Sequence, residues 1–212
     1  MCGFEHADPR WRDDERLSYE PVFVPARPPG SVRVLGIDPG LTRCGFAVLD
    51  GRGPGAAVAV SLGVIRTPAG DPLPSRLAAL RFELAALLTD FEPDAVAVEQ
   101  IFFQVNVRTA MSVAQVSGLA LAEAAARGCD VVQYTPNQVK DAVTGWGGAG
   151  KVQVQKMVQA RLGLSHRPQP ADAADAAALA LCHLASAPMR RSVAAAVAAA
   201  GGRGTSTGDT SR

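Results

Sequence analysis

Histidine and cysteine are scarce in this chain of 212 residues, which contains three histidines and four cysteines. The cysteines stand far apart and form no C-x-x-C pair, which excludes a zinc knuckle and a disulfide framework and fits a reducing compartment. Long apolar runs are absent too: the N-terminal region holds no segment like the core of a signal peptide, and the alanine-rich stretches are too short or too interrupted to span a bilayer. We therefore expect a soluble, cytoplasmic protein without membrane contact.

An excess of one charge is also lacking, since 21 Lys and Arg residues nearly balance 20 Asp and Glu residues, for a net charge of +1. Net charge alone therefore does not indicate a protein that binds nucleic acid. A local basic surface becomes possible if four acidic side chains of the central region hold metal ions, because the remaining charges there are then mostly positive.

The two ends of the chain lack sustained apolar periodicity. Residues 1–31 are rich in Pro, Arg and acidic groups, and residues 187–212 are rich in Ala, Gly, Ser and Thr, so we predict that both are disordered. Residues 32–186 are long enough for one buried α/β domain. Val32 is a possible natural start, because a GTG codon encodes Val internally and can also initiate translation; residues 1–31 would then not belong to the native protein.

The most informative stretch is the mostly apolar run from Val32 to Ile37, which ends in a carboxylate, Asp38. Aliphatic residues without polar alternation are typical of a strand buried on both faces. Pro39-Gly40 then predicts a tight turn of type II, with Gly40 at positive φ. Asp38 should lie at the rim of a core, where an ionised carboxylate needs a cation or hydrogen-bond donors. An Asp that only caps its own turn is the alternative.

The next segments predict an antiparallel meander followed by a crossover. Apolar runs at Cys44–Leu49 and Ala57–Arg66 suit strands, and Asp50-Gly51 between them is a hairpin-type turn signal. The leucine spacing of Leu73–Phe91 predicts an amphipathic helix, and a further strand begins at Ala95.

This further strand, Ala95–Val98, again ends in a carboxylate, Glu99. Because a helical crossover makes the new strand parallel to an earlier one, we expect Glu99 at the same sheet edge as Asp38 if the strands are neighbours. The rest of the chain predicts one more strand and four helices, at Val131–Tyr134, Asn106–Ala126, Pro136–Val143, Val152–Leu162 and from Asp172 through Ala185. The predicted fold class is α/β, with a five-stranded mixed sheet flanked by helices.

Asp172 and Asp175 are three residues apart and therefore share one face of the last helix. Anions are also favoured in the first turn of any helix, so a purely structural role is the alternative. Together with Asp38 and Glu99 they provide four hard oxygen donors without a His or Cys cluster, which favours Mg²⁺ or Mn²⁺ over zinc. Two such ions suit hydrolysis of a phosphodiester.

These acidic motifs resemble those of the RuvC family of Holliday-junction resolvases: Asp38 in Gly-Ile-Asp-Pro-Gly, Glu99 in Val-Glu-Gln-Ile-Phe-Phe, and Asp172 with Asp175 in Pro-Ala-Asp-Ala-Ala-Asp-Ala. The resemblance covers about residues 32–186. It implies an RNase H-like fold, two Mg²⁺ ions per active site with Mn²⁺ as a substitute, and symmetric paired nicks in four-way junction DNA during recombination and repair. It also implies a homodimer and the RuvA-RuvB branch-migration complex as partners. In this family Asp38 would bridge the metals, and the other three carboxylates would complete their coordination.

The resemblance also implies residues that contact DNA. Phe102 matches the family's aromatic that stacks on a base near the junction, and Lys140 and Lys151 match basic residues close to the scissile phosphate. A Phe is more often part of the core, as we expect for Phe103, and a Lys is more often a solvated surface group. Further candidates for phosphate contacts are Arg76, Arg108 and Lys156.

Three other functions are less favoured. Gly145–Val152 approaches a Walker A motif, but it is one residue short and Val152 has no hydroxyl for Mg²⁺. Asp38-Pro-Gly-Leu-Thr42 resembles the phosphate loop of actin-like and sugar-kinase ATPases, yet the chain has no second copy of the motif. A catalytically silent junction-binding protein is the third alternative, and a missing metal ligand would favour it.

Overall fold

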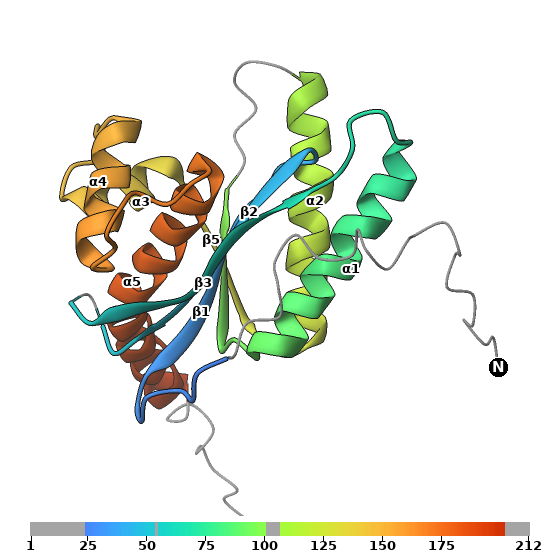
Figure 1. The fold of residues 1–212 in the computed structure, drawn as a ribbon. Coiled ribbons are helices and arrows are strands. Elements are labelled where there is room, and N and C mark those ends of the chain that lie inside the picture. Colours follow the sequence, from blue (N-terminus) through green and yellow to red (C-terminus); the bar gives the residue numbers. More distant parts are fainter. Residues whose placement is uncertain (1–23, 54, 101–106, 202–212) are drawn as a thin grey trace, which may run out of the picture.

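The computed structural model describes residues 24–53, 55–100 and 107–201. They form a five-stranded mixed sheet with strand order β3-β2-β1-β4-β5 (Figure 1). The antiparallel meander consists of β1 (Val32–Asp38), β2 (Arg43–Gly51) and β3 (Ala57–Arg66). The next strands, β4 (Ala95–Glu99) and β5 (Asp130–Tyr134), run parallel to β1. The predicted mixed sheet is thus confirmed.

Helices cover both faces of this sheet, as Figure 1 shows. One face packs against α1 (Leu73–Phe91) and α2 (Val107–Ala126), and the other against α3 (Pro136–Thr144), α4 (Lys151–Arg161) and α5 (Ala171–Gly201). Alternate side chains of the central strands enter the two apolar clusters, because successive residues of a strand point to opposite faces. The middle parts of the central strands are therefore apolar on both faces, which explains the apolar runs of the sequence there.

The packing of α5 on the sheet is unusually close because glycines face alanines there. A Cβ atom at Gly36 of β1 would collide with the carbonyl oxygen of Ala176, and one at Gly45 of β2 would collide with the carbonyl oxygen of Asp172. The facing positions of α5 are mostly small and fully buried, at Ala173, Ala174, Ala176, Ala177 and Ala180. The helix backbone therefore rests directly on β1 and β2, with the start of α5 near the end of β1.

Asp50-Gly51 does not form the predicted turn, since both residues belong to β2 and the connection to β3 follows them. The Asp50 carboxylate is 3% exposed and receives two hydrogen bonds of 2.8 Å from the guanidinium of Arg33, which is 5% exposed. A buried carboxylate needs such a partner, because neither charge is solvated by water. The Asp-Gly pair favours a turn locally, but the ion pair of Asp50 with Arg33 on the neighbouring strand keeps Asp50 in β2.

The ends of the described region also differ from the sequence-based prediction. α5 continues past Ser186 to Gly201 with Pro188 inside it, where we expected a disordered tail. Alanine has the highest helix propensity, and this favours extension of the helix into solvent. At the other end, Arg27 donates two hydrogen bonds of 2.7 Å to Asp94 and so ties residues preceding β1 to the sheet. Among the described residues, no helix is long and apolar enough to cross a membrane.

We predict that Arg33→Ala lowers the free energy of unfolding by about 3–5 kcal/mol, because it leaves the Asp50 carboxylate buried without a cation. Urea unfolding monitored by circular dichroism measures this loss. Arg190→Ala is the matched control, since the Arg190–Asp130 pair is exposed and spans 3.6 Å, and it should cost less than about 1 kcal/mol. Equal losses in the two variants would contradict the assigned role of the buried pair.

Candidate active site

Two carboxylates meet at the carboxyl edge of the parallel strands. Ile37 of β1 pairs with Val98 of β4, so Asp38 and Glu99 each follow directly at the ends of neighbouring strands. The expectation that they share one edge is confirmed. They line a hollow of about 490 Å³ together with Asp175 of α5 and two lysines, Lys140 and Lys151.

The second pair of carboxylates comes from the start of α5. Asp172 lies in the first turn of this helix and Asp175 lies one turn later. Their position follows from the close packing at Gly45, whose missing side chain leaves room for the backbone of Asp172. The same contact places the start of the helix beside the end of β1, so both carboxylates lie close enough to Asp38 to interact with its charge.

The loop after Asp38 is tight, but not for the predicted reason. Gly40 does not adopt positive φ, so the predicted type II geometry is wrong. Glycine is needed instead because a Cβ at this position would collide with the carbonyl oxygen of Arg43. The guanidinium of Arg76 stabilises this loop by donating hydrogen bonds of 2.9 Å to Thr67 Oγ1 and 2.7 Å to Thr42 Oγ1.

The four carboxylates crowd one another. Burial, together with the negative charges of Glu99, Asp175 and Asp172, raises the pKa of Asp38 to about 7. Burial and then the Asp175 charge also raise the pKa of Glu99, while Lys151 and Lys140 oppose the increase. Ionisation of Asp38 and Glu99 is therefore less favourable than usual without added positive charge, a pattern typical of functional sites.

Two basic side chains contact the carboxylates of α5 directly. Lys151 Nζ lies 2.7 Å from Asp175 Oδ2, and Arg43 Nη2 forms an ion pair with Asp172 Oδ2. In the described part of the chain no three Asp, Glu, His or Cys side chains converge as a ready metal-binding group. Asp172 and Asp175 are instead paired with Arg43 and Lys151.

Arg43 is a site residue that the sequence did not reveal. Its position has a simple topological cause: β2 runs antiparallel to β1 with Gly45 opposite Asp38, so Arg43 extends beyond the end of β1 on the side of α5. Arg43 can be recognised as a site residue only when the pairing of β1 with β2 is known. No local motif marks this residue.

The predicted DNA-contacting residues lie in different environments. Lys140 and Lys151 line the hollow, and Lys156 is exposed on α4. Arg76 is only 8% exposed and is bound to two threonines, which does not favour the predicted phosphate contact. Phe102 and Phe103 lie outside the described residues, as does the side chain of Arg108 on α2.

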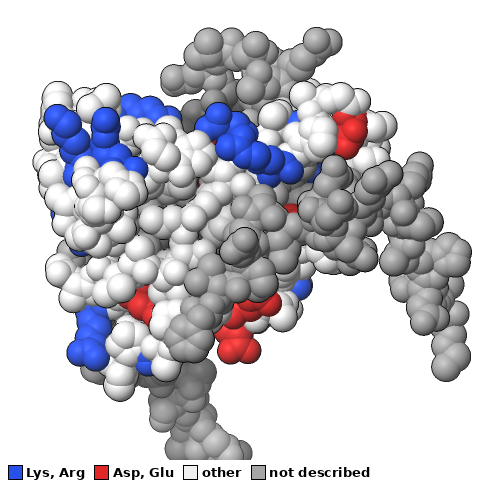
Figure 2. Space-filling view, in the orientation of Figure 1, with Lys and Arg blue, Asp and Glu red and all other residues white. Residues whose placement is uncertain are grey.

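The helix beside the hollow is purely basic in its charge. α4 carries Lys151, Lys156 and Arg161 and no acidic residue. In Figure 2, Lys and Arg side chains gather over the part of the molecule where α4 lies in Figure 1. The acidic hollow therefore has a positive flank, an arrangement suited to a polyanion whose backbone passes close to bound cations.

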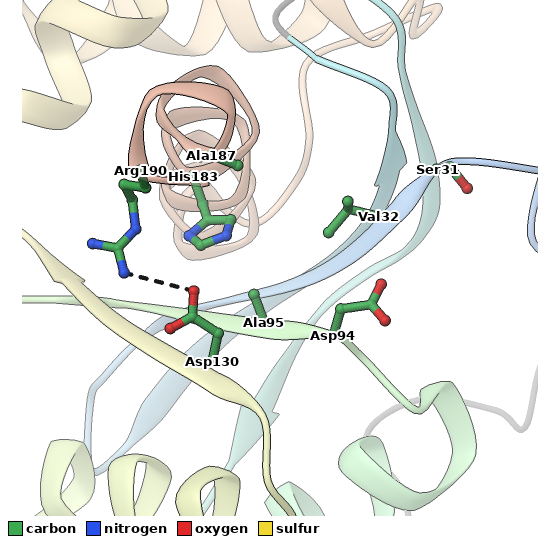
Figure 3. Close-up of a pocket in the computed structure, with 8 residues that line it drawn as sticks. All are labelled: Ser31, Val32, Asp94, Ala95, Asp130, His183, Ala187 and Arg190. Atoms are coloured by element: carbon green, nitrogen blue, oxygen red, sulfur yellow. Dashed lines mark ion pairs between the residues drawn. The ribbon is translucent and has the colours of Figure 1, made fainter. Parts of the chain in front are cut away.

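A second hollow, of about 500 Å³, lies at the opposite edge of the sheet between α5 and the beginnings of β1, β4 and β5 (Figure 3). Its acidic side chains are already paired: Asp130 with Arg190 at 3.6 Å, and Asp94 with Arg27 at 2.7 Å. His183, which is buried there, shares a 3.1 Å hydrogen bond with Tyr134. The crowded carboxylates at the other edge therefore form the candidate active site.

Comparison with known proteins supports the same site. Residues 34–183 match the family described as "Crossover junction endodeoxyribonuclease RuvC". A protein of that name from Leifsonia xyli is 56% identical over 153 residues, which are 72% of this chain and 74% of the relative. Another from Frankia alni is 53% identical over 169 residues, covering 80% and 86% of the two chains.

Solved structures agree with the fold. The Thermus thermophilus RuvC structure is 38% identical, with a TM-score of 0.69, and the match covers 74% of this chain and 96% of that one. T. thermophilus RuvC in complex with a Holliday junction substrate gives 37% identity and a TM-score of 0.72, covering 75% and 96%. The fold is thus the RNase H-like fold that the sequence motifs implied. The family match includes Asp38, Glu99, Asp172 and Asp175. This chain therefore belongs to the crossover junction endodeoxyribonuclease RuvC family.

Proposed function

We propose that this protein is a metal-dependent endodeoxyribonuclease that resolves four-way DNA junctions by paired, symmetric nicks. The observation that carries the proposal is that Asp38 and Glu99 end neighbouring strands, while the charges of Asp172 and Asp175 at the start of α5 are close enough to act on Asp38. Membership of the family and the likeness to a relative bound to a Holliday junction substrate support the substrate.

The residues of the site fit divalent metal ions. All four acidic side chains offer oxygen ligands, which Mg²⁺ and Mn²⁺ prefer, and the described site includes no thiolate or imidazole ligand. Burial and neighbouring negative charges raise the pKa of Asp38 and of Glu99, and bound cations would oppose this increase. When bound, two such ions activate a water molecule and stabilise the leaving oxygen of a phosphodiester.

The basic residues have a separate task in this proposal. Lys140 and Lys151 lie beside the carboxylates and are placed to bind the phosphate groups that enter the hollow. Lys151 would bind a phosphate in place of Asp175, because a flexible ammonium group can exchange one anionic partner for another, and Asp175 would then be available as an oxygen ligand. Arg43 would free Asp172 by the same exchange. We also propose a homodimer as the cutting unit, since symmetric nicks need two sites, and contact with the RuvA-RuvB complex remains a prediction from the family.

No observation favours the alternative functions. The loop Gly145–Val152 lies between two helices, whereas a Walker A loop follows a strand. All four candidate metal ligands are present, so a catalytically silent protein gains no support.

The decisive experiment compares a mobile four-way DNA junction with a linear duplex of the same sequence, in Mg²⁺ and in EDTA, and maps the nicks. The proposal expects paired symmetric nicks in the junction alone, and only with metal. Cutting of the linear duplex at an equal rate, or junction cutting in EDTA, would contradict it.

Asp38→Asn and Asp175→Asn should each lower junction cleavage about 100-fold or more while junction binding is kept, because an amide preserves shape but loses the charge that holds a cation. Nicking assays and electrophoretic mobility shifts on the same preparations measure the two properties. Asp141→Asn, an exposed change on α3, is the control and should cut normally. Cleavage by Asp38→Asn at the wild-type rate would count against the site.

Metal-free Asp38→Asn should also be more stable than the wild-type protein at pH 8. The folded protein holds the Asp38 proton with a pKa of about 7, against an ordinary value of 3.8, so the associated stability is present below about pH 4 and is lost as the pH rises to 7. An amide does not titrate and avoids this loss. In EDTA, we expect the melting temperature of the variant relative to wild type to rise by at least about 2–4 °C between pH 4.5 and pH 8. A difference that is the same at both pH values would contradict the assigned burial and charge crowding of Asp38.

A further inference from the structure

The loop between α3 and α4 carries an exposed aromatic side chain that the proposed mechanism does not use. Trp146 is 61% exposed, whereas tryptophan is usually among the more buried residues. Its loop borders the active site, because Ala149 and Gly150 line the same hollow as the carboxylates. Trp146 therefore belongs to a loop that borders the site.

Hydrogen bonds fix the backbone of Trp146 in place. The Ala149 N–H donates to the Trp146 carbonyl oxygen at 3.1 Å, closing a turn whose end Cα atoms lie within about 7 Å of each other. The Trp146 N–H donates to Thr144 Oγ1 at 3.2 Å, and this hydroxyl lies 2.8 Å from the Lys140 carbonyl oxygen, to which it donates. The backbone of Trp146 is thus linked by hydrogen bonds to Ala149 and, through Thr144, to Lys140, and both Ala149 and Lys140 line the hollow.

The indole ring also packs against a neighbouring residue of the loop. A Cβ atom at Gly148 would lie 2.7 Å from Cζ2 and 2.8 Å from Cε2 of Trp146, so the ring rests on this glycine. Only a residue without a side chain allows that contact. The rest of the ring faces solvent, and a ring that is already positioned loses little conformational entropy when it binds a ligand.

The charges around this ring favour a nucleic acid over an apolar protein partner. Lys140 and Lys151 lie in the adjoining wall, and α4, which follows the loop, has no acidic residue. Basic side chains beside an exposed aromatic ring are the combination by which proteins bind single nucleic-acid strands, with phosphates on the cations and a base on the ring.

We propose that Trp146 binds DNA by stacking its indole on a base of the strand that enters the hollow, close to the phosphate that is cut. This inference rests on the proposed nuclease function. It adds to that function an aromatic contact on the α3–α4 side of the site, from a part of the chain far in sequence from the segment after Glu99.

Fluorescence tests the contact directly, because Trp11 and Trp146 are the two tryptophans of the chain. In a full-length Trp11→Phe chain that also carries Asp38→Asn to prevent cutting, all tryptophan emission comes from Trp146. Titration with a four-way junction should quench this emission in step with binding, followed in parallel by anisotropy of a dye on the DNA. Emission that stays unchanged when the DNA is saturated with protein would overturn the proposal.

Affinity measurements provide the second test. Trp146→Ala should weaken junction binding about 5- to 100-fold, the range expected for loss of one stacked base, and Trp146→Phe should recover most of the loss. Phe82→Ala is the matched control, since Phe82 is 58% exposed on α1, across the sheet, and should bind within about twofold of wild type. All three variants should melt near the wild-type temperature, because these side chains are largely exposed.

The outcomes separate this inference from the proposed function. If the wild-type protein cuts junctions and Trp146→Ala binds them as tightly as wild type, the stacking contact is wrong and the nuclease stands. If the wild-type protein neither binds nor cuts a junction, both fall together. A large fall in the melting temperature of Trp146→Ala, without weaker DNA binding, would make the indole a structural residue and would also overturn the proposal.

Discussion

The contact between the backbone of α5 and two glycines of the sheet determines where the active-site carboxylates lie. Gly36 and Gly45 leave no side chain between the strands and the helix, and the alanines of α5 complete this close fit. The start of the helix is thereby held against the end of β1, and the charges of Asp172 and Asp175 reach Asp38. Dispersion forces at this dry interface must outweigh the repulsion among the carboxylates at its edge.

That repulsion is moderated by cations that belong to the protein. Lys151 pairs with Asp175 and Arg43 with Asp172, while Asp38 and Glu99 lie deeper in the hollow and have raised pKa values. Asp172 and Asp175 are therefore each paired with a cation in the folded chain, whereas Asp38 and Glu99 have no ion-pair partner among the described residues. Added positive charge would therefore lower the pKa of Asp38 and Glu99, the two carboxyl groups that the fold leaves without an ion pair of their own.

The ends of β1 and β4 could be predicted from the sequence, since a short apolar run that stops at Asp38 or Glu99 has few other interpretations. The predicted helices also agree with the observed ones to within a few residues, except at the end of α5. Prediction failed where a distant partner decides the outcome. Asp50 looked like a turn residue until Arg33, on the neighbouring strand, was seen to bind it. Arg43 was missed for the same reason, because Asp172 lies 129 residues away in the chain. The phosphate contact of Arg76 stays a prediction, which its hydrogen bonds to Thr67 and Thr42 do not favour. The roles of individual basic residues came from the family resemblance and could not be derived from local pattern.

α5 is a single helix whose two halves have different surroundings. Up to about Ala187 its residues are packed against the sheet, and the family match ends close by, at residue 183. Beyond Pro188 the large apolar side chains face solvent, with Met189 74% and Val197 66% exposed. Substitutions in the first half alter the packing that spaces the carboxylates. In the second half Arg190 still pairs with Asp130 of β5, but Met189 and Val197 extend into solvent, so substitutions of these two residues leave the packing of the helix on the sheet unchanged.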